Sequence, residues 1–412
     1  MSQIETNWSF VGEGEEAPDG FSFSGIAAGL KDSKKKDLAL ILAPENSICS
    51  GLFTQSKVRA SCVDICEQRI KKSSGLIRAI LINSGQANAC TGDTGIQHTL
   101  IATKEVSQLL GINDEEVLMC STGVIGIPIK LKKLIDNLPD LVKELKINNF
   151  HNAAEAILTT DLVEKKITIE TLIEGRKVKI SGFAKGSGMI YPNMATMLAF
   201  LTCDVGVEKE NWDKMISIAV KKSFNAISVD GETSTNDAFI GINAGKKVDK
   251  KFLSKIQSGI DIVCQSLAKN IARDGEGANC LLEVLVEGAK SNSDAIKMAK
   301  SICNSSLVKT AIHGCDPNWG RIISAAGNSE IEFKLDLVDL YIGDFQILKK
   351  GKLNHFDSDK VSNYMRKKMN GKYLVEDIVS IVLKLNSGTA KGTAWGCDLS
   401  KEYVEINSEY TT

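Results

Sequence analysis

A single threonine stands where a glycine-rich loop passes into an apolar run, in the stretch AKGSGMIYPNMATMLAFLTCD (residues 184–204). If the bond between Ala195 and Thr196 is cut, the new α-amino group has a reference pKa of about 7.7–8.0. A neutral amine of that kind, beside the hydroxyl of the same residue, can take the hydroxyl proton near neutral pH and create a nucleophile. Thr196 is therefore a candidate N-terminal nucleophile, and a threonine that simply opens a strand is the alternative.

The same hydroxyl can make that cut by attacking the carbonyl of Ala195, which moves the peptide to an ester that water then hydrolyses. Such an attack needs a bent backbone, and the segment has residue types that favour one. Gly186 and Gly188 tolerate unusual dihedral angles, and Pro192 fixes its own φ at about −65°. The segment is thus compatible with self-cleavage between Ala195 and Thr196.

Other polar motifs contain groups suited to a small-molecule pocket. In STGVIG, the Thr122 hydroxyl and the Gly123 N–H are candidates for an oxyanion hole, with a strand-to-loop turn as the alternative. Glu276 lies between glycines in ARDGEGAN, where its carboxylate suits either a substrate amine or a surface turn. Thr159 and Thr160 in TTD follow an alanine-rich helix, as a cap or as ligand contacts.

Three further features have less specific signals. SVDGETSTNDAF gathers Asp230, Asp237 and several hydroxyls, but its spacing does not match an EF-hand loop, so turn chemistry is favoured over a metal. Arg321 in HGCDPNWGRI opens a predicted helix and is a candidate partner for a carboxylate. The four histidines lie far apart and form no ligand pair, so we expect no metal site.

Strand-like and helix-like segments alternate along the chain, which predicts an α/β protein of layered sheets and helices. Buried strands are predicted at 37–44, 78–85, 115–123, 280–289 and 331–343, and a hairpin at 166–183. Helices are predicted at 96–111, 212–227, 251–275 and 294–314. No linker cleanly separates domains.

Composition and charge restrict the classes of function. The 412 residues include 50 basic and 51 acidic side chains, a net charge of −1, so nothing indicates binding to nucleic acid or to a membrane surface. Neither a signal peptide nor an apolar run of about 18 residues is recognised, so we expect a soluble cytoplasmic protein. The 11 cysteines are odd in number and include no CxxC pair, which favours reduced thiols over disulfides.

Taken together, the motifs resemble the ornithine acetyltransferase family, also called bifunctional glutamate N-acetyltransferase. The segments that carry the resemblance are KGSGMIYPNMATML, STGVIG, TTD, DGETSTND, RDGEGA, DPNWGRI and the C-terminal INSEYTT. Tyr191 stands where a small residue is expected, and Glu232 where an aspartate is expected. The resemblance implies the layered α/β fold of the self-processing N-terminal-nucleophile type. It also implies cleavage between Ala195 and Thr196 into an α subunit (1–195) and a β subunit (196–412).

The resemblance assigns a role to each motif residue. Thr196 would be both the cleavage residue and the nucleophile that accepts the acyl group, with Thr122 and Gly123 as the oxyanion hole. The substrate would be bound by Thr196 and by a further set of residues: Thr159 or Thr160, Lys185, Glu276, Asn407 and the terminal Thr412. No cofactor and no metal would be needed.

The implied reaction belongs to arginine biosynthesis. The acetyl group of N2-acetyl-L-ornithine would move to Thr196, and L-ornithine would leave. L-Glutamate would then take the acetyl group as N-acetyl-L-glutamate, by ping-pong kinetics. Acetyl-CoA is a further donor in part of the family, and the resemblance leaves its use open here. The α and β fragments would stay associated, as an α2β2 assembly.

Two rival hypotheses are kept. A hydrolase or aminopeptidase of the same self-processing architecture would use Thr196 but deliver the acyl group to water. A non-catalytic binding or scaffolding protein would keep Thr196 as a strand residue in an uncut chain.

Overall fold

Three β-sheets organise the part of the chain that this computed structural model describes, residues 7–12, 17–191 and 197–409. The N-terminal sheet has the order β2-β3-β5-β6, from β2 (Ser22–Ile26), β3 (Leu38–Leu42), β5 (Ala79–Gln86) and β6 (Val117–Val124). The central sheet has the order β1-β7-β8-β9-β10-β4. Its strands are β1 (Ser9–Phe10), β4 (Ile48–Phe53), β7 (Lys165–Ile173), β8 (Arg176–Lys185), β9 (Leu198–Cys203) and β10 (Ala238–Asn243).

The C-terminal sheet has the order β14-β13-β12-β15-β11-β16. Its strands are β11 (Leu281–Ala289), β12 (Asp339–Ile342), β13 (Phe345–Lys349), β14 (Lys352–Leu353), β15 (Ile378–Lys384) and β16 (Ala390–Cys397). The α-helices are α1 (Ser61–Lys72), α2 (Gly92–Leu110), α3 (Leu131–Lys143), α4 (Phe150–Ala156), α5 (Lys209–Lys221), α6 (Leu253–Arg273), α7 (Asn292–Asn304), α8 (Ser306–His313), α9 (Trp319–Gly327), α10 (Ser358–Met369) and α11 (Lys401–Glu409). The predicted class, an α/β protein of layered sheets and helices, is confirmed.

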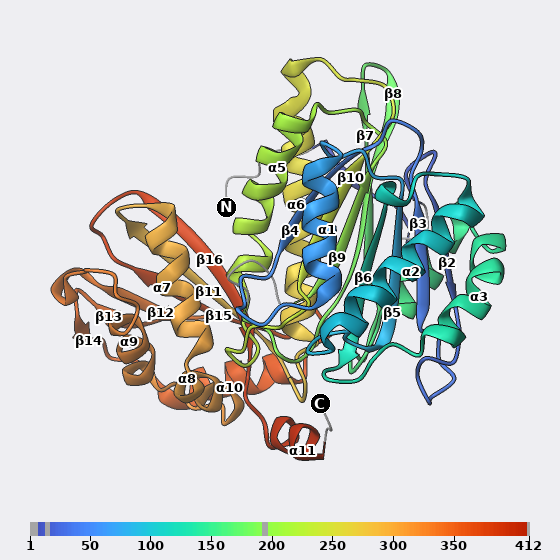
Figure 1. Cartoon of the computed structure of the whole chain (residues 1–412). Coiled ribbons are helices and arrows are strands. Elements are labelled where there is room, and N and C mark those ends of the chain that lie inside the picture. Colours follow the sequence, from blue (N-terminus) through green and yellow to red (C-terminus); the bar gives the residue numbers. More distant parts are fainter. Residues whose placement is uncertain (1–6, 13–16, 192–196, 410–412) are drawn as a thin grey trace.

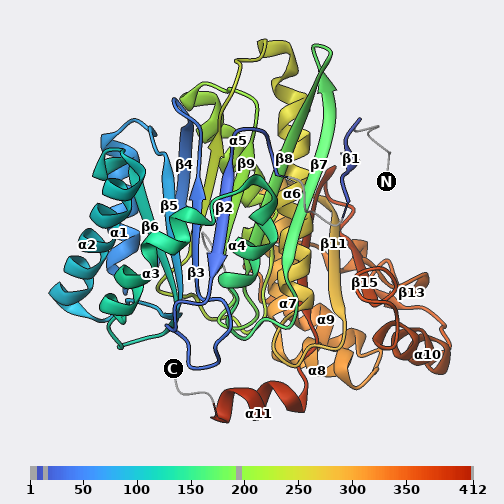
Figure 2. The ribbon, with the colours of Figure 1, turned by 90° about the vertical axis from the view of Figure 1, so that its right-hand side faces the viewer.

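Helices and sheets alternate as layers (Figures 1 and 2). Helices α2 and α3 cover one face of the N-terminal sheet, and α1 and α4 lie between that sheet and the central sheet. Helices α5 and α6 cover the opposite face of the central sheet. Successive side chains of β3 point to opposite faces of the sheet. Leu38 and Leu40 face α2 and α3, whereas Ala39 and Ile41 face the central sheet.

Strand β9 follows the predicted nucleophile and is buried on both faces. Leu198 and Phe200 join the core between the two sheets, and Ala199, Leu201 and Cys203 join the core under α5 and α6. A strand covered on both sides is apolar at every position rather than at every second one. This explains why the run after residue 196 contains almost no polar residue.

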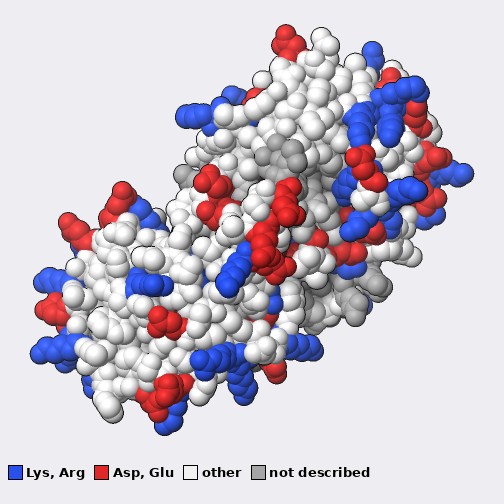
Figure 3. Space-filling view, turned by 90° about the horizontal axis from the view of Figure 1, so that it is seen from below, with Lys and Arg blue, Asp and Glu red and all other residues white. Residues whose placement is uncertain are grey.

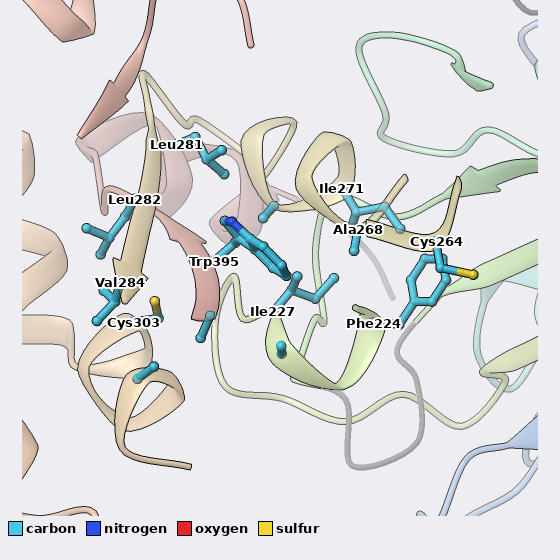
Figure 4. Close-up of a cluster of buried hydrophobic side chains, with 14 of the residues drawn as sticks. Phe224, Ile227, Cys264, Ala268, Ile271, Leu281, Leu282, Val284, Cys303 and Trp395 are labelled. Atoms are coloured by element: carbon cyan, nitrogen blue, oxygen red, sulfur yellow. The ribbon is translucent and has the colours of Figure 1, made fainter. Parts of the chain in front are cut away.

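The C-terminal sheet is held to the central sheet by a shared apolar core (Figure 4). Trp395 of β16 is buried beside Ile227, and the backbone N–H of Ser228 donates to the Trp395 carbonyl at 2.9 Å. Burying a large apolar side chain in such a core stabilises the folded protein by about 1.5–3 kcal/mol. Trp395 is in turn paired with Glu283 of β11, so this contact joins the C-terminal sheet to the segment that precedes Ser228.

Three predicted elements differ from the structure. The helix predicted at 212–227 ends at Lys221, and Phe224–Ala226 form a separate 3-10 turn. The helix predicted at 294–314 is divided into α7 and α8, because Ser305 adopts an extended conformation and its hydroxyl accepts the Val308 N–H as an N-cap. The strand predicted at 331–343 pairs only over Asp339–Ile342. Ile331 and Phe333 pack against the core without strand pairing, so the alternating pattern there reflects burial on one side alone.

The predicted subunit boundary does not separate two domains. Strand β8, which precedes residue 195, is paired with β9, which follows residue 196. Strand β4 of the first segment likewise pairs with β10 of the second. Both segments thus contribute neighbouring strands to the same central sheet. No helix within the described residues is long and apolar enough to cross a membrane.

Candidate functional site

A pocket opens at the edge where β6 and β8 end and β9 begins. Because β8 and β9 are antiparallel, Lys185 at the end of β8 lies opposite Leu198 at the start of β9. The pocket brings together most of the residues that the sequence motifs predicted. The described lining residues are Ala87, Thr122, Gly123, Ile125, Thr159, Thr160, Lys185, Gly188, Met189, Met197, Leu198, Ser234, Thr235, Asn236, Asp237, Glu276 and Asn407.

Thr122 and Gly123 form one wall, at the irregular end of the β5–β6 pair. Gly123 has a φ of +125°, and a Cβ added there would lie 2.3 Å from the carbonyl carbon of Gly85. Only glycine fits this position, so the close approach of β5 and β6 depends on it. Thr122 is buried, with 8% of its surface exposed, and Gly123 is half-buried.

The ammonium group of Lys185 points to the same wall. Its Nζ donates to Oγ1 of Thr122 at 3.3 Å. Burial lowers the pKa of Lys185, and the carboxylates of Asp161, Asp237 and Glu276 oppose that effect. Among the described lining residues Lys185 is the one cation, so it is the natural partner for a substrate carboxylate.

The TTD motif lies at a second wall, where both threonines line the pocket. Oγ1 of Thr160 is hydrogen-bonded to Oγ of Ser187 at 2.7 Å, which ties this loop to the glycine-rich segment. The third residue, Asp161, lies behind the wall and accepts the N–H groups of Thr159 and Gly186. Sequence reasoning assigned no role to Asp161, although its place inside the motif was a signal.

The loop at 228–239 supports the pocket by turn chemistry. Oδ2 and Oδ1 of Asp230 accept the N–H groups of Met189 and Ile190 at 2.6 and 2.9 Å. The side chain of Asn236 donates to the carbonyls of Ala87 and Ser121, and so holds the ends of β5 and β6 together. Ser234, Thr235, Asn236 and Asp237 all line the pocket.

Glu276 and the last helix close the opposite side. Oε2 of Glu276 accepts the side-chain amide of Asn407 at 2.9 Å, although the two residues are 131 positions apart. Helix α11 is seated on Gly277, whose φ is +68° and whose added Cβ would lie 2.6 Å from the backbone nitrogen of Tyr403. In Figure 1, α11 lies at the lower edge of the molecule, apart from the helices that cover the sheets. Figure 3, which views the molecule from below, shows acidic and basic side chains interspersed over this face.

Three predicted residues lie outside the described part of the chain: Ala195, Thr196 and Thr412. The residues after the first two are described, and both Met197 and Leu198 line the pocket. Strand β9, which begins at Leu198, therefore starts at the pocket.

Other residues that the sequence singled out do not join the pocket. Arg321 donates to the carbonyl of Leu307 at 3.0 Å and to Oγ1 of Thr310 at 3.3 Å, so it braces α8 instead of binding a carboxylate. The Tyr191 ring faces the ammonium group of Lys300 at 4.0 Å.

All 11 cysteines are free thiols, and every one except Cys90 is buried. Within the described ranges no group of three or more His, Cys, Asp or Glu side chains is arranged to hold a metal ion.

Comparisons with known proteins find similarity along nearly the whole chain. A family model described as the ArgJ family matches residues 22–412. The chain is 90% identical over 402 residues to the arginine biosynthesis bifunctional protein ArgJ of Prochlorococcus marinus subsp. pastoris, which covers 98% of this chain and 100% of that protein. It is 53% identical over 405 residues to ArgJ of another Prochlorococcus marinus strain, covering 98% of this chain and 96% of that protein. The crystal structure of the same bifunctional protein from Bacillus halodurans is 37% identical, with a TM-score of 0.48, and covers 52% of this chain and 100% of that chain.

Proposed function

This chain belongs to the ArgJ family and is a bifunctional acetyltransferase of arginine biosynthesis, and we propose that it works through an acetyl ester on Thr196. The acetyl donor is N2-acetyl-L-ornithine and the acceptor is L-glutamate. One observation carries the proposal. Thr122, Gly123, Lys185, Glu276 and Asn407 come from distant parts of the chain and line a single pocket, together with the two residues that follow Thr196.

The first half-reaction transfers the acetyl group to the enzyme. The acetamide carbonyl of the donor lies against Thr122 and Gly123, which stabilise the negative charge that forms on its oxygen. The free α-amine of Thr196 takes the proton from its own hydroxyl, and Oγ attacks the carbonyl carbon. The C–N bond then breaks, the ornithine amine leaves with a proton, and the acetyl group remains on Oγ as an ester.

The second half-reaction reverses these steps with a different amine. The α-amino group of glutamate attacks the ester carbon, the C–O bond breaks, and Oγ of Thr196 regains a proton. Ornithine and glutamate both present an α-carboxylate, and Lys185 supplies the positive charge to bind it. One pocket therefore serves both substrates. The second activity of the bifunctional enzyme uses the thioester acetyl-CoA, which forms the same acetyl ester.

Cleavage between Ala195 and Thr196 is part of the same proposal, since it creates the α-amine that the mechanism uses. The products are an α subunit of residues 1–195 and a β subunit of residues 196–412. The pairing of β8 with β9 and of β4 with β10 supports their staying associated. The α2β2 assembly and the cytoplasmic location expected from the sequence belong to this proposal as well.

The test is the intact mass of the denatured protein, measured before and after incubation with N2-acetyl-L-ornithine. We expect two fragments, the second beginning at Thr196 and gaining the mass of one acetyl group. Thr196→Ala should remain a single uncut chain, and Thr196→Ser, which keeps the hydroxyl, should still be cut. An uncut wild-type chain would overturn the proposed mechanism. Acetate release without glutamate, at the rate of the transfer, would favour the hydrolase instead.

A further inference from the structure

We infer that Asp161 is a positioning residue of this enzyme, which joins two walls of the pocket and holds Lys185 in place to bind the substrate carboxylate. The inference rests on the proposed function, because that function assigns Lys185 to the carboxylate. Asp161 does not line the pocket itself. It acts on the residues that do, through its two carboxylate oxygens.

Each oxygen of Asp161 is bonded to a different wall. Oδ1 accepts the backbone N–H of Gly186 at 2.7 Å, which fixes the chain directly after Lys185. Oδ2 accepts the backbone N–H of Thr159 at 3.0 Å, at the threonine wall. A carboxylate has two acceptor oxygens and can serve both walls at once, whereas an amide has one.

The carboxylate is kept charged by a buried lysine. Nζ of Lys165 lies 2.6 Å from Oδ1 of Asp161 and 2.5 Å from Oδ2 of Asp274. The side chains of Lys165 and Asp161 have no exposed surface, so the ions are screened very little. Burial alone would raise the pKa of Asp161, but the ammonium groups of Lys165 and Lys185 outweigh it and hold that pKa well below its usual range.

Asp274 provides a matched control inside the same network. Its side chain contacts the same lysine, and the other described hydrogen bond of that side chain is with the backbone N–H of Leu162, at 3.1 Å from Oδ2. It is bonded neither to Gly186 nor to Thr159, and it does not line the pocket. Removing either carboxylate disturbs the buried ion pair, but only the loss of Asp161 releases the pocket walls.

Asp161 also contributes to the charge on Lys185. Anions favour the protonated form of a nearby lysine, so removing one lowers the pKa of Lys185 further. Other groups also act on Lys185 from the surrounding elements: Lys31, Lys165, Asp237 and Glu276. Asp161 also raises the pKa of Lys31, so its loss does not strengthen the charge of that neighbour. Loss of Asp161 therefore both displaces the ammonium group and makes it easier to deprotonate.

The experiment compares Asp161→Asn with Asp274→Asn in the full-length enzyme, using acetyl transfer from N2-acetyl-L-ornithine to L-glutamate. We expect Asp161→Asn to raise KM for both substrates by about 10–100-fold, because a charge-assisted hydrogen bond is lost. Its kcat should stay within about 3-fold of the wild-type value. Asp274→Asn should leave KM within about 3-fold. The alkaline rise of KM should move to lower pH in Asp161→Asn alone.

A second variant protects the test against misfolding. Asp161→Asn leaves Lys165 charged beside one carboxylate, and this can destabilise the fold. In Asp161→Asn/Lys165→Met both partners are neutral, and Asp274 can take up a proton because burial raises its pKa. We expect this double variant to fold with a Tm near that of wild type and to keep the raised KM.

The outcomes separate the inference from the proposed function. If Asp161→Asn and Asp274→Asn raise KM equally, or if the double variant regains the wild-type KM, Asp161 is only a structural ion-pair partner and the inference is overturned. If the wild-type enzyme itself fails to transfer acetyl groups, the proposed function has failed instead.

Discussion

Two walls of the pocket are built in opposite ways. The sheet wall consists of Thr122 and Gly123, which lie in the paired strand β6, and of Asn236, whose side chain is bonded to the ends of β5 and β6; Thr122 and Asn236 are buried. The helix wall is formed by Glu276, Gly277 and α11. No side chain of α11 is fully buried, and the described contacts that hold that helix are its packing on Gly277, the amide–carboxylate bond of Asn407 and a hydrogen bond of Tyr403 with Asp230.

On the proposed function, catalysis belongs to the sheet wall and substrate entry to the helix wall. An oxyanion hole must be rigid before the charge develops, and a wall buried in paired strands has that property. An exposed helix with few apolar contacts opens at low free-energy cost. We therefore expect changes in the sheet wall to lower kcat and changes in the helix wall to raise KM.

Gly123→Ala should have the largest effect. The new Cβ would lie 2.3 Å from a backbone atom of Gly85, at a φ that disfavours a side chain. We expect kcat to fall by about 100–1,000-fold. The free energy of unfolding, measured by denaturant titration, should fall by about 3 kcal/mol from strain and overpacking. Gly126→Ala is the control, because Gly126 also has a positive φ but no atom within 4 Å of the added Cβ. A similar loss of kcat in both variants would remove the crowding explanation.

Gly277→Ala should have an intermediate effect. Its Cβ would meet the backbone nitrogen of Tyr403 at 2.6 Å and displace α11 as a unit. We expect KM for N2-acetyl-L-ornithine to rise by about 10-fold, equivalent to about 1.4 kcal/mol of binding, with kcat almost unchanged. Steady-state kinetics would check this. A fall in kcat comparable to that of Gly123→Ala would contradict the division of roles between the two walls.

Asn407→Ala should have the smallest effect. The substitution removes the amide that Glu276 accepts at an exposed position, where a hydrogen bond contributes about 0.5–1.5 kcal/mol. We expect KM to rise by about 2–10-fold at unchanged kcat. Ser408→Ala, on the same helix, removes a hydroxyl that is bonded only to Glu405 within α11 and should change neither constant. Equal effects of the two changes would show that the Asn407 amide has no specific role and that α11 acts only through its position.

The sequence predicted local structure better than long-range contacts. The strands at 37–44 and 78–85 and the hairpin at 166–183 were read correctly because their apolar pattern reports burial directly. The break at Ser305 was missed because apolar residues continue at helical spacing on both sides of it. The prediction of a strand over the whole of 331–343 was wrong, because alternating apolar and polar residues indicate which side of the chain is buried and not whether a neighbouring strand is present.

The pocket was predictable mainly through its motifs. Glu276 and Asn407 are brought together by the docking of α11, and no local pattern indicates that contact. Asp161 was missed for a different reason, since its role depends on Lys165 and Gly186 lying behind the wall. Such a role is visible only when the fold has placed all three groups.

The strand order of the central sheet has a consequence for the lifetime of the enzyme. If the chain is cut at Thr196, one fragment supplies β4 and β8 and the other supplies β9 and β10, so neither fragment holds the sheet alone. An uncut precursor folds in a unimolecular reaction, whereas two separated fragments must first meet, and their reassembly depends on concentration. A cut enzyme that unfolds in dilute solution would rarely recover. The time for which the cut enzyme stays folded would then depend on its rate of unfolding and not on an equilibrium between folded and unfolded states.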